Sequence, residues 1–354
     1  MKHSDQYPIG GSREKKTAGK GILLLCFAVC FLLLASAAHA DDIHSRAAIV
    51  IEASTGRVLY GKNPNLRLPP ASTTKLMTAM VALDRLDVND VVTISERAAN
   101  VSPVKAHFRA GEKVTVRTLL YAALLKSAND AAVALAEAAG GTEEKFAELM
   151  NQKVLALGMS DTKFINATGL PGNGQYSTVY DLSRMMRNSL RYPLIREIIN
   201  TKASSVSTEA GRTIFLKNIN KLLWEDDSLL GGKTGYTRAA KHCFVCAGLQ
   251  DDETIIVAVM GAPSRETLWK ESGSLLARGF TVRNSQEEPS VYFTRSDYRP
   301  ALERASYNPD APQAKKASYK KAEKKSGKKA KGKKKTKTKH YATEQTRAKN
   351  ADVS

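Results

Sequence analysis

Apolar positions recur at regular spacings between residues 47 and 285, and short polar stretches separate one run from the next. In AAIVIEASTGRVLYGKN (47–63) two apolar runs flank a Ser-Thr-Gly turn, which predicts a β-hairpin. Further along, the apolar residues of several runs fall on one face of a helix. This spacing predicts helices at about 72–84, 116–126, 129–141, 142–159, 177–192 and 264–279. The stretches 243–249 and 254–262 instead predict two strands, joined as a hairpin by the turn sequence QDDE.

This order of strands, many helices, strands and a final helix predicts an α+β fold. An antiparallel sheet formed from both ends of the domain would be flanked by helices, with a helical lobe inserted between its strands. The helix at 129–141 is expected to be capped by its first Asn or Asp and ended by Gly. We take 41–285 as one folded domain and 286–312 as a short C-terminal extension. Residues 313–354 lack apolar periodicity and are predicted to be disordered.

The N-terminal 40 residues have the pattern of a signal peptide. Basic residues precede the apolar run Gly21–Ala38, which ends in the small-residue pattern Ala38-His39-Ala40. Cleavage after about Ala40 would start the mature chain near Asp41 and place it in the periplasm or cell envelope. Retention of the segment as a membrane anchor stays open, because about 17 apolar residues is marginally enough to span a bilayer.

The net charge of +19 comes mainly from the C-terminal tail. Residues 313–354 hold 15 Lys and 1 Arg against 3 acidic residues, whereas 41–312 are close to neutral. Such a tail binds polyanions without sequence specificity. For an exported chain the available polyanions are anionic lipids, lipopolysaccharide and cell-wall carboxylates, so no specific nucleic acid is expected. A solvated spacer is the alternative, because charge runs are commonly just that.

The cysteines indicate neither a disulfide nor a metal site in the mature chain. Cys26 and Cys30 lie in the signal segment, which leaves Cys243 and Cys246. On a strand, residues three apart are separated by about 10 Å, which is beyond disulfide reach. No second pair completes a zinc site, and His44, His107 and His242 form no ligand pattern. We therefore expect two buried free thiols, and neither metal nor cofactor.

The first candidate for chemistry is Ser72-x-x-Lys75 in PPASTTKLMTAM. Residues three apart share a helix face, and the preceding proline pair places Ser72 near the helix start. A serine hydroxyl needs a base to become a nucleophile. Burial lowers the pKa of a lysine, so the Lys75 amine could be that base. Alone, the pattern is equally typical of an N-cap serine and a solvated lysine.

Two further short motifs complete the pattern. Ser127-x-Asn129 lies in a break between two apolar helices, where it could relay a proton and bind a substrate amide. The alternative interpretation of this motif is an Asn helix cap.

The third motif, Lys233-Thr234-Gly235, is followed by Tyr236 and Thr237 and could hold a substrate carboxylate. Its glycine permits close approach of a substrate backbone. Its alternative is a basic turn.

Together, in this order, the three motifs resemble the serine D-alanyl-D-alanine carboxypeptidases, the low-molecular-mass penicillin-binding proteins. The resemblance covers roughly residues 44–285. It includes the landmark stretches AAIVIEASTGRVLYGKN, SERAA (95–99), NDAAVALAE, NATGL, YSTVYDL and NINKLL (218–223). It implies the β-lactamase/DD-peptidase-like form of the α+β fold and β-lactam antibiotics as covalent inhibitors. Many relatives have His where Thr168 and Tyr236 stand here.

The resemblance also implies a role for each motif residue. Ser72 would form the acyl-enzyme with Lys75 as general base, and Ser127 and Asn129 would line the other side of the cleft. The backbone N–H groups of Ser72 and Tyr236 would form the oxyanion hole. The terminal carboxylate of the substrate would be bound by Lys233 and Thr234, with Gly235 and Thr237 beside them.

The implied function is an exported serine DD-carboxypeptidase that removes the terminal D-alanine from peptidoglycan stem pentapeptides. A D-alanyl-D-alanine endopeptidase uses the same groups and remains open. A β-lactamase needs a further general base for fast deacylation, and no Glu lies between residues 160 and 180. A non-enzymatic protein of the same fold would have a broken motif, and none is broken. The non-enzyme alternative that stays open is an envelope protein that binds polyanions through its Lys-rich tail.

Overall fold

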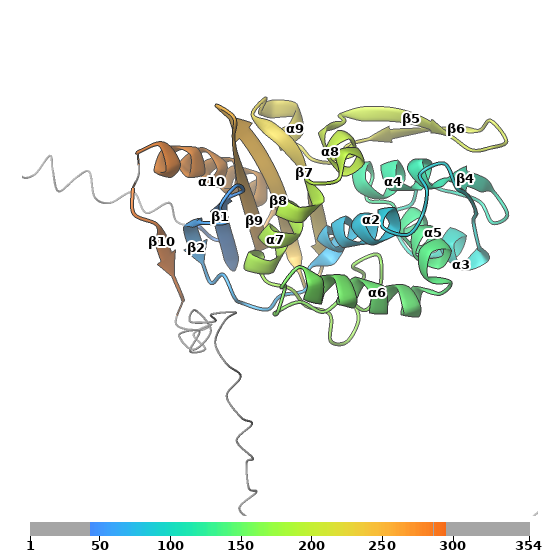
Figure 1. The fold of residues 1–354 in the computed structure, drawn as a ribbon, viewed down its shortest axis with the longest axis horizontal. Coiled ribbons are helices and arrows are strands. Elements are labelled where there is room, and N and C mark those ends of the chain that lie inside the picture. Colours follow the sequence, from blue (N-terminus) through green and yellow to red (C-terminus); the bar gives the residue numbers. More distant parts are fainter. Residues whose placement is uncertain (1–42, 286, 295–354) are drawn as a thin grey trace, which may run out of the picture. The chain divides into compact units, whose positions relative to one another are not determined.

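A six-stranded sheet forms the centre of the computed structural model, which describes residues 43–285 and 287–294. The strand order is β10-β2-β1-β9-β8-β7, and every neighbouring pair is antiparallel except β10 and β2. The first and last parts of the described chain thus meet in one sheet (Figure 1). Its strands are β1 (Ala47–Glu52), β2 (Val58–Lys62), β7 (Leu229–Thr237), β8 (Lys241–Gln250), β9 (Glu253–Ala262) and β10 (Ser290–Tyr292).

The two faces of this sheet belong to two different hydrophobic clusters. Along β1, Ala47, Ile49 and Ile51 face one cluster, whereas Ala48 and Val50 face the other. Successive side chains of a strand point to opposite faces, and both faces are covered, so the strand is apolar at nearly every position. Helix α7 (Val179–Ser189) packs on one face of the sheet, and α10 (Arg265–Ser285) contacts β9, β8 and β1 from the other.

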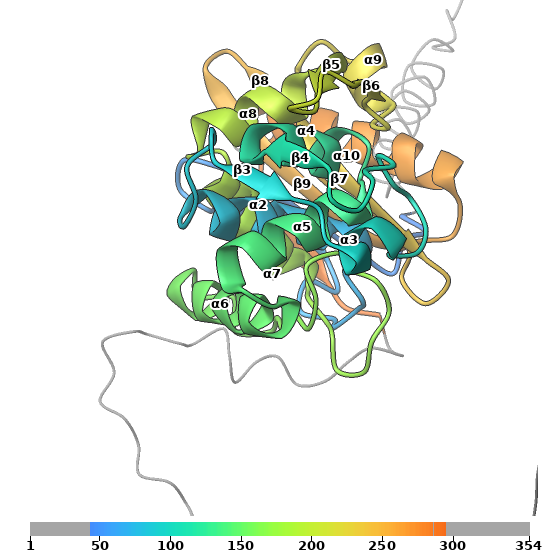
Figure 2. The same cartoon turned by 90° about the vertical axis from the view of Figure 1, so that its right-hand side faces the viewer.

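The chain between β2 and β7 forms the helical lobe, seen end-on in Figure 2. Its helices are α2 (Lys75–Leu83), α3 (Glu96–Asn100), α4 (Val116–Leu125), α5 (Asn129–Gly140), α6 (Glu143–Ala156) and α8 (Pro193–Asn200). The short α9 (Leu222–Glu225) instead contacts β7 and belongs to the hydrophobic cluster of α10. A 3-10 turn, η1 (Ala71–Thr74), leads into α2. Two small antiparallel sheets complete the lobe. One pairs β3 (Val91–Thr93) with β4 (Lys113–Thr115), which helix α3 separates in sequence, and the other is the hairpin of β5 (Ala203–Ser207) and β6 (Thr213–Lys217).

The predicted α+β fold, with an antiparallel-rich sheet and an inserted helical lobe, is confirmed. The hairpins at 47–63 and 243–262 are present, as are all six predicted helices. The 264–279 helix is longer than predicted and continues to Ser285. Gly279 does not end it. A Cβ there would lie 2.6 Å from Ile255 and 2.7 Å from Val50, so this glycine permits close packing of α10 on the sheet.

One predicted helix cap is wrong, and helix α7 starts two residues later than predicted. The residue before α5 is Ala128, which makes no side-chain cap, and the Asn129 side chain is used elsewhere. Helix α7 is capped by Thr178, whose hydroxyl accepts from the Asp181 N–H. The buried, unpaired state predicted for Cys243 and Cys246 is confirmed.

The predicted signal segment (1–40) and Lys-rich tail (313–354) lie outside the described residues. Of the extension at 286–312, residues 290–292 form β10 beside β2 and so join the sheet. In the part of the chain that the structure covers, no helix combines the length and apolar character needed to cross a membrane.

Candidate active site

Ser72 and Lys75 lie on adjoining helical turns at the start of the lobe. Pro70 precedes η1, Ser72 lies inside it, and Lys75 is the first residue of α2. The Ser72 hydroxyl does not cap the helix. Instead, the Lys75 Nζ atom lies 2.9 Å from Ser72 Oγ, as the three-residue spacing predicted. The lysine side chain is fully buried, whereas Ser72 is partly exposed.

Two other acceptors hold the Lys75 amine. Its Nζ donates to the Asn129 side-chain oxygen at 2.7 Å and to the Thr168 carbonyl at 2.7 Å. The Asn129 NH2 group faces the Ser102 and Pro103 carbonyls, which fixes the amide with its oxygen toward Lys75. A neutral amine has two N–H bonds and one lone pair. With both N–H bonds used by these acceptors, the lone pair is left for the Ser72 hydroxyl.

The surroundings of Lys75 favour this neutral form. Burial lowers the pKa of Lys75 well below its ordinary value of 10.5, and the nearby Lys233 charge lowers it further. The Asp130 carboxylate acts in the opposite direction. Desolvation dominates because the amine has no exposed surface and no carboxylate within hydrogen-bond distance among the described contacts.

Ser127 and Lys233 form the second polar pair. The Lys233 Nζ donates to Ser127 Oγ at 2.9 Å and to the Thr234 carbonyl at 3.0 Å. Ser127 has a φ of 62°, a left-handed conformation unusual for serine, in the tight link between α4 and α5. Burial lowers the pKa of Lys233 to about 7, so a bound anion can readily determine whether this amine is charged.

Gly235 brings β7 directly against η1. A Cβ at this position would lie 2.8 Å from the Ser72 nitrogen and 2.9 Å from the Ala71 Cβ. The glycine is therefore needed for contact within the chain itself, in addition to any approach of a substrate backbone. Strand β7 is an edge strand, so alternate backbone groups lack a partner strand. Ser72 is the second residue of its helical turn, where backbone N–H groups have no intrahelical acceptor.

The last two predicted site residues lie at the end of β7. Tyr236 is 55% exposed and its ring stacks on His242, with 4.5 Å between ring centroids. The Thr237 hydroxyl accepts from the Ala240 N–H at 3.0 Å and so closes the turn into β8. Thr234 is partly exposed beside Lys233.

The role of the Asn166–Leu170 loop in this site was not predicted from the sequence. In the sequence, NATGL was used only as a stretch shared with the family. The only feature noted in it was the Thr168 side chain, because many relatives have His at this position. The contact that matters is made by the Thr168 main-chain oxygen, which lies 2.7 Å from Lys75 Nζ and 3.4 Å from Ser72 Oγ. The available signal was the Asn-x-Thr-Gly pattern, which is typical of a tight turn.

No metal site accompanies these groups in the described chain. Within 43–285 and 287–294, no three His, Cys, Asp or Glu side chains are grouped so that they could hold an ion. The site therefore consists of two buried lysines, each paired with a serine hydroxyl, joined through Asn129 and the Gly235 contact.

Such a Ser–Lys pair between a helical lobe and the edge strand of an α+β sheet defines a serine hydrolase of the penicillin-binding class. A family model described as D-alanyl-D-alanine carboxypeptidase (Peptidase_S11) matches residues 34–264. The chain belongs to this D-alanyl-D-alanine carboxypeptidase family, and it is a serine-type peptidase.

Relatives and solved structures agree with the family. The chain is 36% identical to the D-alanyl-D-alanine carboxypeptidase DacF of Bacillus subtilis over 78% of this chain and 72% of that protein. It is 31% identical to a D-alanyl-D-alanine endopeptidase of Escherichia coli over 70% and 84%. The crystal structure of the Streptomyces K15 DD-transpeptidase superposes with a TM-score of 0.64 at 31% identity. That superposition covers 68% of this chain and 98% of the other.

Proposed function

We propose that this chain removes the terminal D-alanine from peptidoglycan stem pentapeptides through an acyl-enzyme on Ser72. The observation that carries the proposal is the Lys75 amine, which is buried, held by two acceptors and 2.9 Å from the Ser72 hydroxyl. Family membership supports the reaction class.

In the acylation step, Ser72 Oγ attacks the carbonyl carbon of the penultimate D-alanine and gives its proton to Lys75. The backbone N–H groups of Ser72 and Tyr236 stabilise the resulting oxyanion, a contribution of about 3–4 kcal/mol in comparable sites. The C–N bond then breaks. Ser127, hydrogen-bonded to Lys233, gives its proton to the departing D-alanine amine and takes in exchange the proton that Lys75 accepted, so Lys75 is neutral again.

In the second step, water attacks the ester carbonyl, with Lys75 again accepting a proton. The ester bond breaks, the shortened stem peptide leaves, and Ser72 regains its hydrogen. Lys233 and Thr234, with Thr237 beside them, bind the terminal carboxylate of the substrate. Asn129 keeps Lys75 in place. Because its NH2 group faces the Ser102 and Pro103 carbonyls, it binds a substrate amide by accepting the amide N–H at its side-chain oxygen.

β-Lactams should acylate Ser72 and leave slowly. The carboxylate of Glu143 approaches the Asn166–Leu170 loop, but it is occupied by the Ala167 N–H and by Arg97. It is therefore not free to activate a deacylating water, as a β-lactamase would require.

Cleavage of D-alanyl cross-links is the second candidate function. Relatives named D-alanyl-D-alanine endopeptidase in Escherichia coli and Pseudomonas aeruginosa are 31% and 33% identical to this chain. Incubating the purified protein with a pentapeptide monomer and with a cross-linked dimer separates the two activities. If only the monomer is cut and D-alanine is released, the carboxypeptidase activity is supported. If only the dimer is cut, the carboxypeptidase activity is rejected. Ser72→Ala should abolish all turnover and penicillin labelling, and persistent labelling would exclude Ser72 as the nucleophile.

Export to the periplasm or cell envelope belongs to the same proposal. Ile43 is buried, and the Glu271 carboxylate accepts from the Ser45 N–H at 3.2 Å, so cleavage after about Ala40 keeps these contacts intact. N-terminal sequencing of protein recovered from the envelope tests it. An intact Met1 would reject cleavage.

The Lys-rich tail would tether the enzyme to anionic envelope surfaces. The support is its charge alone. At low salt, the full chain should sediment with membranes or sacculi and a chain ending at residue 312 should not. Equal sedimentation would reject the tether.

A further inference from the structure

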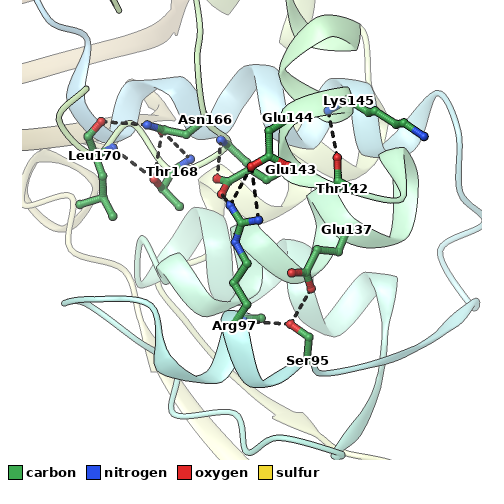
Figure 3. Close-up of polar contacts among 12 residues, drawn as sticks. Ser95, Arg97, Glu137, Thr142, Glu143, Glu144, Lys145, Asn166, Thr168 and Leu170 are labelled. Carbon is green, nitrogen blue, oxygen red and sulfur yellow. Dashed lines mark hydrogen bonds and ion pairs between the residues drawn. The ribbon is translucent and has the colours of Figure 1, made fainter. Parts of the chain in front are cut away.

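The loop that presents the Thr168 carbonyl to Lys75 is a tight turn built around one side chain (Figure 3). Asn166 Oδ1 accepts from the Thr168 N–H, the Thr168 hydroxyl and the Gly169 N–H. The Asn166 NH2 group donates to the Leu170 carbonyl at 3.0 Å. The loop is therefore rigid within itself, but these bonds do not determine where it lies relative to α2.

Glu143, the first residue of α6, supplies an external anchor for this loop. Its Oε1 atom accepts from the Ala167 N–H at 3.1 Å, one residue before Thr168. Thr142 caps α6 by accepting from the Lys145 N–H, which fixes the start of the helix and the position of Glu143. The Ala167 carbonyl in turn accepts from the Thr78 hydroxyl of α2 at 2.7 Å.

The second oxygen of Glu143 is held by Arg97 of α3. The Arg97 guanidinium donates to Glu143 Oε2 at 2.7 Å, and it also contacts Glu144 at 3.3 Å. The Glu143 side chain is 11% exposed, whereas that of Glu144 is 71% exposed and makes no contact with the loop among the described interactions. In Figure 3, Ser95 lies below Arg97 and Glu143 and hydrogen-bonds to Glu137. The Ser95 hydroxyl also accepts from the Ala98 N–H.

We infer that Glu143 is a positioning residue for the general base. Glu143 anchors the Ala167 N–H and thereby fixes the position of the Thr168 carbonyl. This carbonyl in turn orients the Lys75 amine toward Ser72. This inference rests on the proposed function of Lys75. We expect the length of the Glu143 side chain to determine this positioning, because it brings an acceptor oxygen to the Ala167 N–H. The charge of Glu143 is secondary, because an uncharged side-chain amide of the same length can place an oxygen at the same position.

Two substitutions separate reach from charge. Glu143→Gln keeps the side-chain length and an acceptor oxygen for the Ala167 N–H. It loses the charge and the acceptor for Arg97, which retains Glu144 as a partner. Glu143→Asp keeps the charge but withdraws the carboxylate by about 1.5 Å, beyond hydrogen-bond distance of the amide. The half-exposed Arg97 can follow the shorter side chain. Glu144→Ala is the matched control, since it removes the other partner of Arg97 and leaves the loop contact unchanged.

The measurement is the rate of covalent labelling by a fluorescent penicillin as a function of its concentration. This gives the acylation rate constant and the noncovalent dissociation constant separately. Only protein that finally binds one penicillin molecule per chain is compared. We expect Glu143→Asp to lower the acylation rate constant by about 10- to 100-fold, as expected for a small misplacement of a reacting group, with an unchanged dissociation constant. Glu143→Gln and Glu144→Ala should stay near wild type.

Wild-type acylation in Glu143→Asp would overturn the inference, and so would equal losses in the Asp and Gln variants, which would make charge decisive. A loss in Glu144→Ala as large as in Glu143→Asp would move the effect to Arg97 and also overturn it. Failure of the folded wild-type protein to label is a distinguishable result. It overturns the proposed function, and the inference with it.

Discussion

The Lys75 amine lies 2.9 Å from the Ser72 hydroxyl and joins α2 to α5 and to the Asn166–Leu170 loop. Asn129 brings α5 to it and Thr168 brings the loop. Lys233 approaches from β7 and lowers its pKa. The geometry therefore makes the acidity of one lysine depend on four elements that are distant in sequence.

Replacing this base should stop acylation without harming the fold. Lys75→Met keeps the length and suits the buried site, so we expect penicillin acylation to fall by about 10²- to 10⁴-fold, the usual contribution of a general base. Stopped-flow labelling measures the loss. Lys145→Met, at an exposed lysine of α6, serves as the control. Acylation at the wild-type rate in Lys75→Met would exclude Lys75 as the base.

The second-order rate constant of acylation should have a bell-shaped pH dependence. The rate rises with pH as Lys75 loses its proton, and it falls above about pH 7 as Lys233 loses the charge that holds the penicillin carboxylate, since the pKa of Lys233 is lowered to about 7. At saturating penicillin the bound carboxylate keeps Lys233 charged. The alkaline fall should therefore move to higher pH in the first-order rate constant, and a fall at the same pH in both constants would contradict this assignment.

The buried charge of Lys233 should also cost stability in a defined pH window. Its folded pKa of about 7 lies below the ordinary value of 10.5, so the folded state binds fewer protons, and stability rises as pH increases between these values. Lys233→Met removes this dependence and should stabilise the fold at pH 7 by up to roughly 4 kcal/mol. Urea unfolding at pH 7 and pH 10 measures both effects. A variant less stable than wild type at pH 7 would show that the Ser127 contact outweighs desolvation.

Gly169→Ala should disrupt the loop that holds Lys75. A Cβ at Gly169 would lie 1.8 Å from the Ala71 carbonyl, and its φ of +78° adds strain of about 1–3 kcal/mol. We expect both the free energy of unfolding and the acylation rate to fall. Gly111 has the same φ of +78° with nothing within 4 Å of its Cβ position, so Gly111→Ala isolates the strain and should keep normal acylation. Equal acylation by the two variants would reject the steric argument.

The two β8 cysteines should be inert until the protein unfolds. Burial raises the pKa of Cys243 to about 12 and also raises that of Cys246, so neither is a thiolate at neutral pH. In protein that starts at Asp41, a thiol-reactive probe should label no residue under native conditions and two per chain in denaturant. Labelling of one cysteine in the folded protein would show that β8 opens locally.

The sequence by itself determined the α+β fold, the predicted helices and hairpins, and the three polar motifs. These depend on local periodicity and on residue types at fixed spacing, and the Ser72–Lys75 pair is local because residues three apart share a helix face. Elements with weaker local patterns were missed. The short hairpin of β5 and β6 and the three-residue β10 form because neighbouring segments provide partners for their backbone groups.

Only the tertiary structure decided which groups converge on Lys75. Asn129 was predicted to be a possible cap of α5, yet its amide joins Lys75 to the Ser102 and Pro103 carbonyls. Thr168 contributes a main-chain oxygen, and every residue carries one, so its identity could not reveal the contact. In the sequence, Glu143 is indistinguishable from an ordinary acidic residue at a helix start. The desolvation that lowers the pKa of both site lysines likewise arises only when distant elements pack together and exclude water.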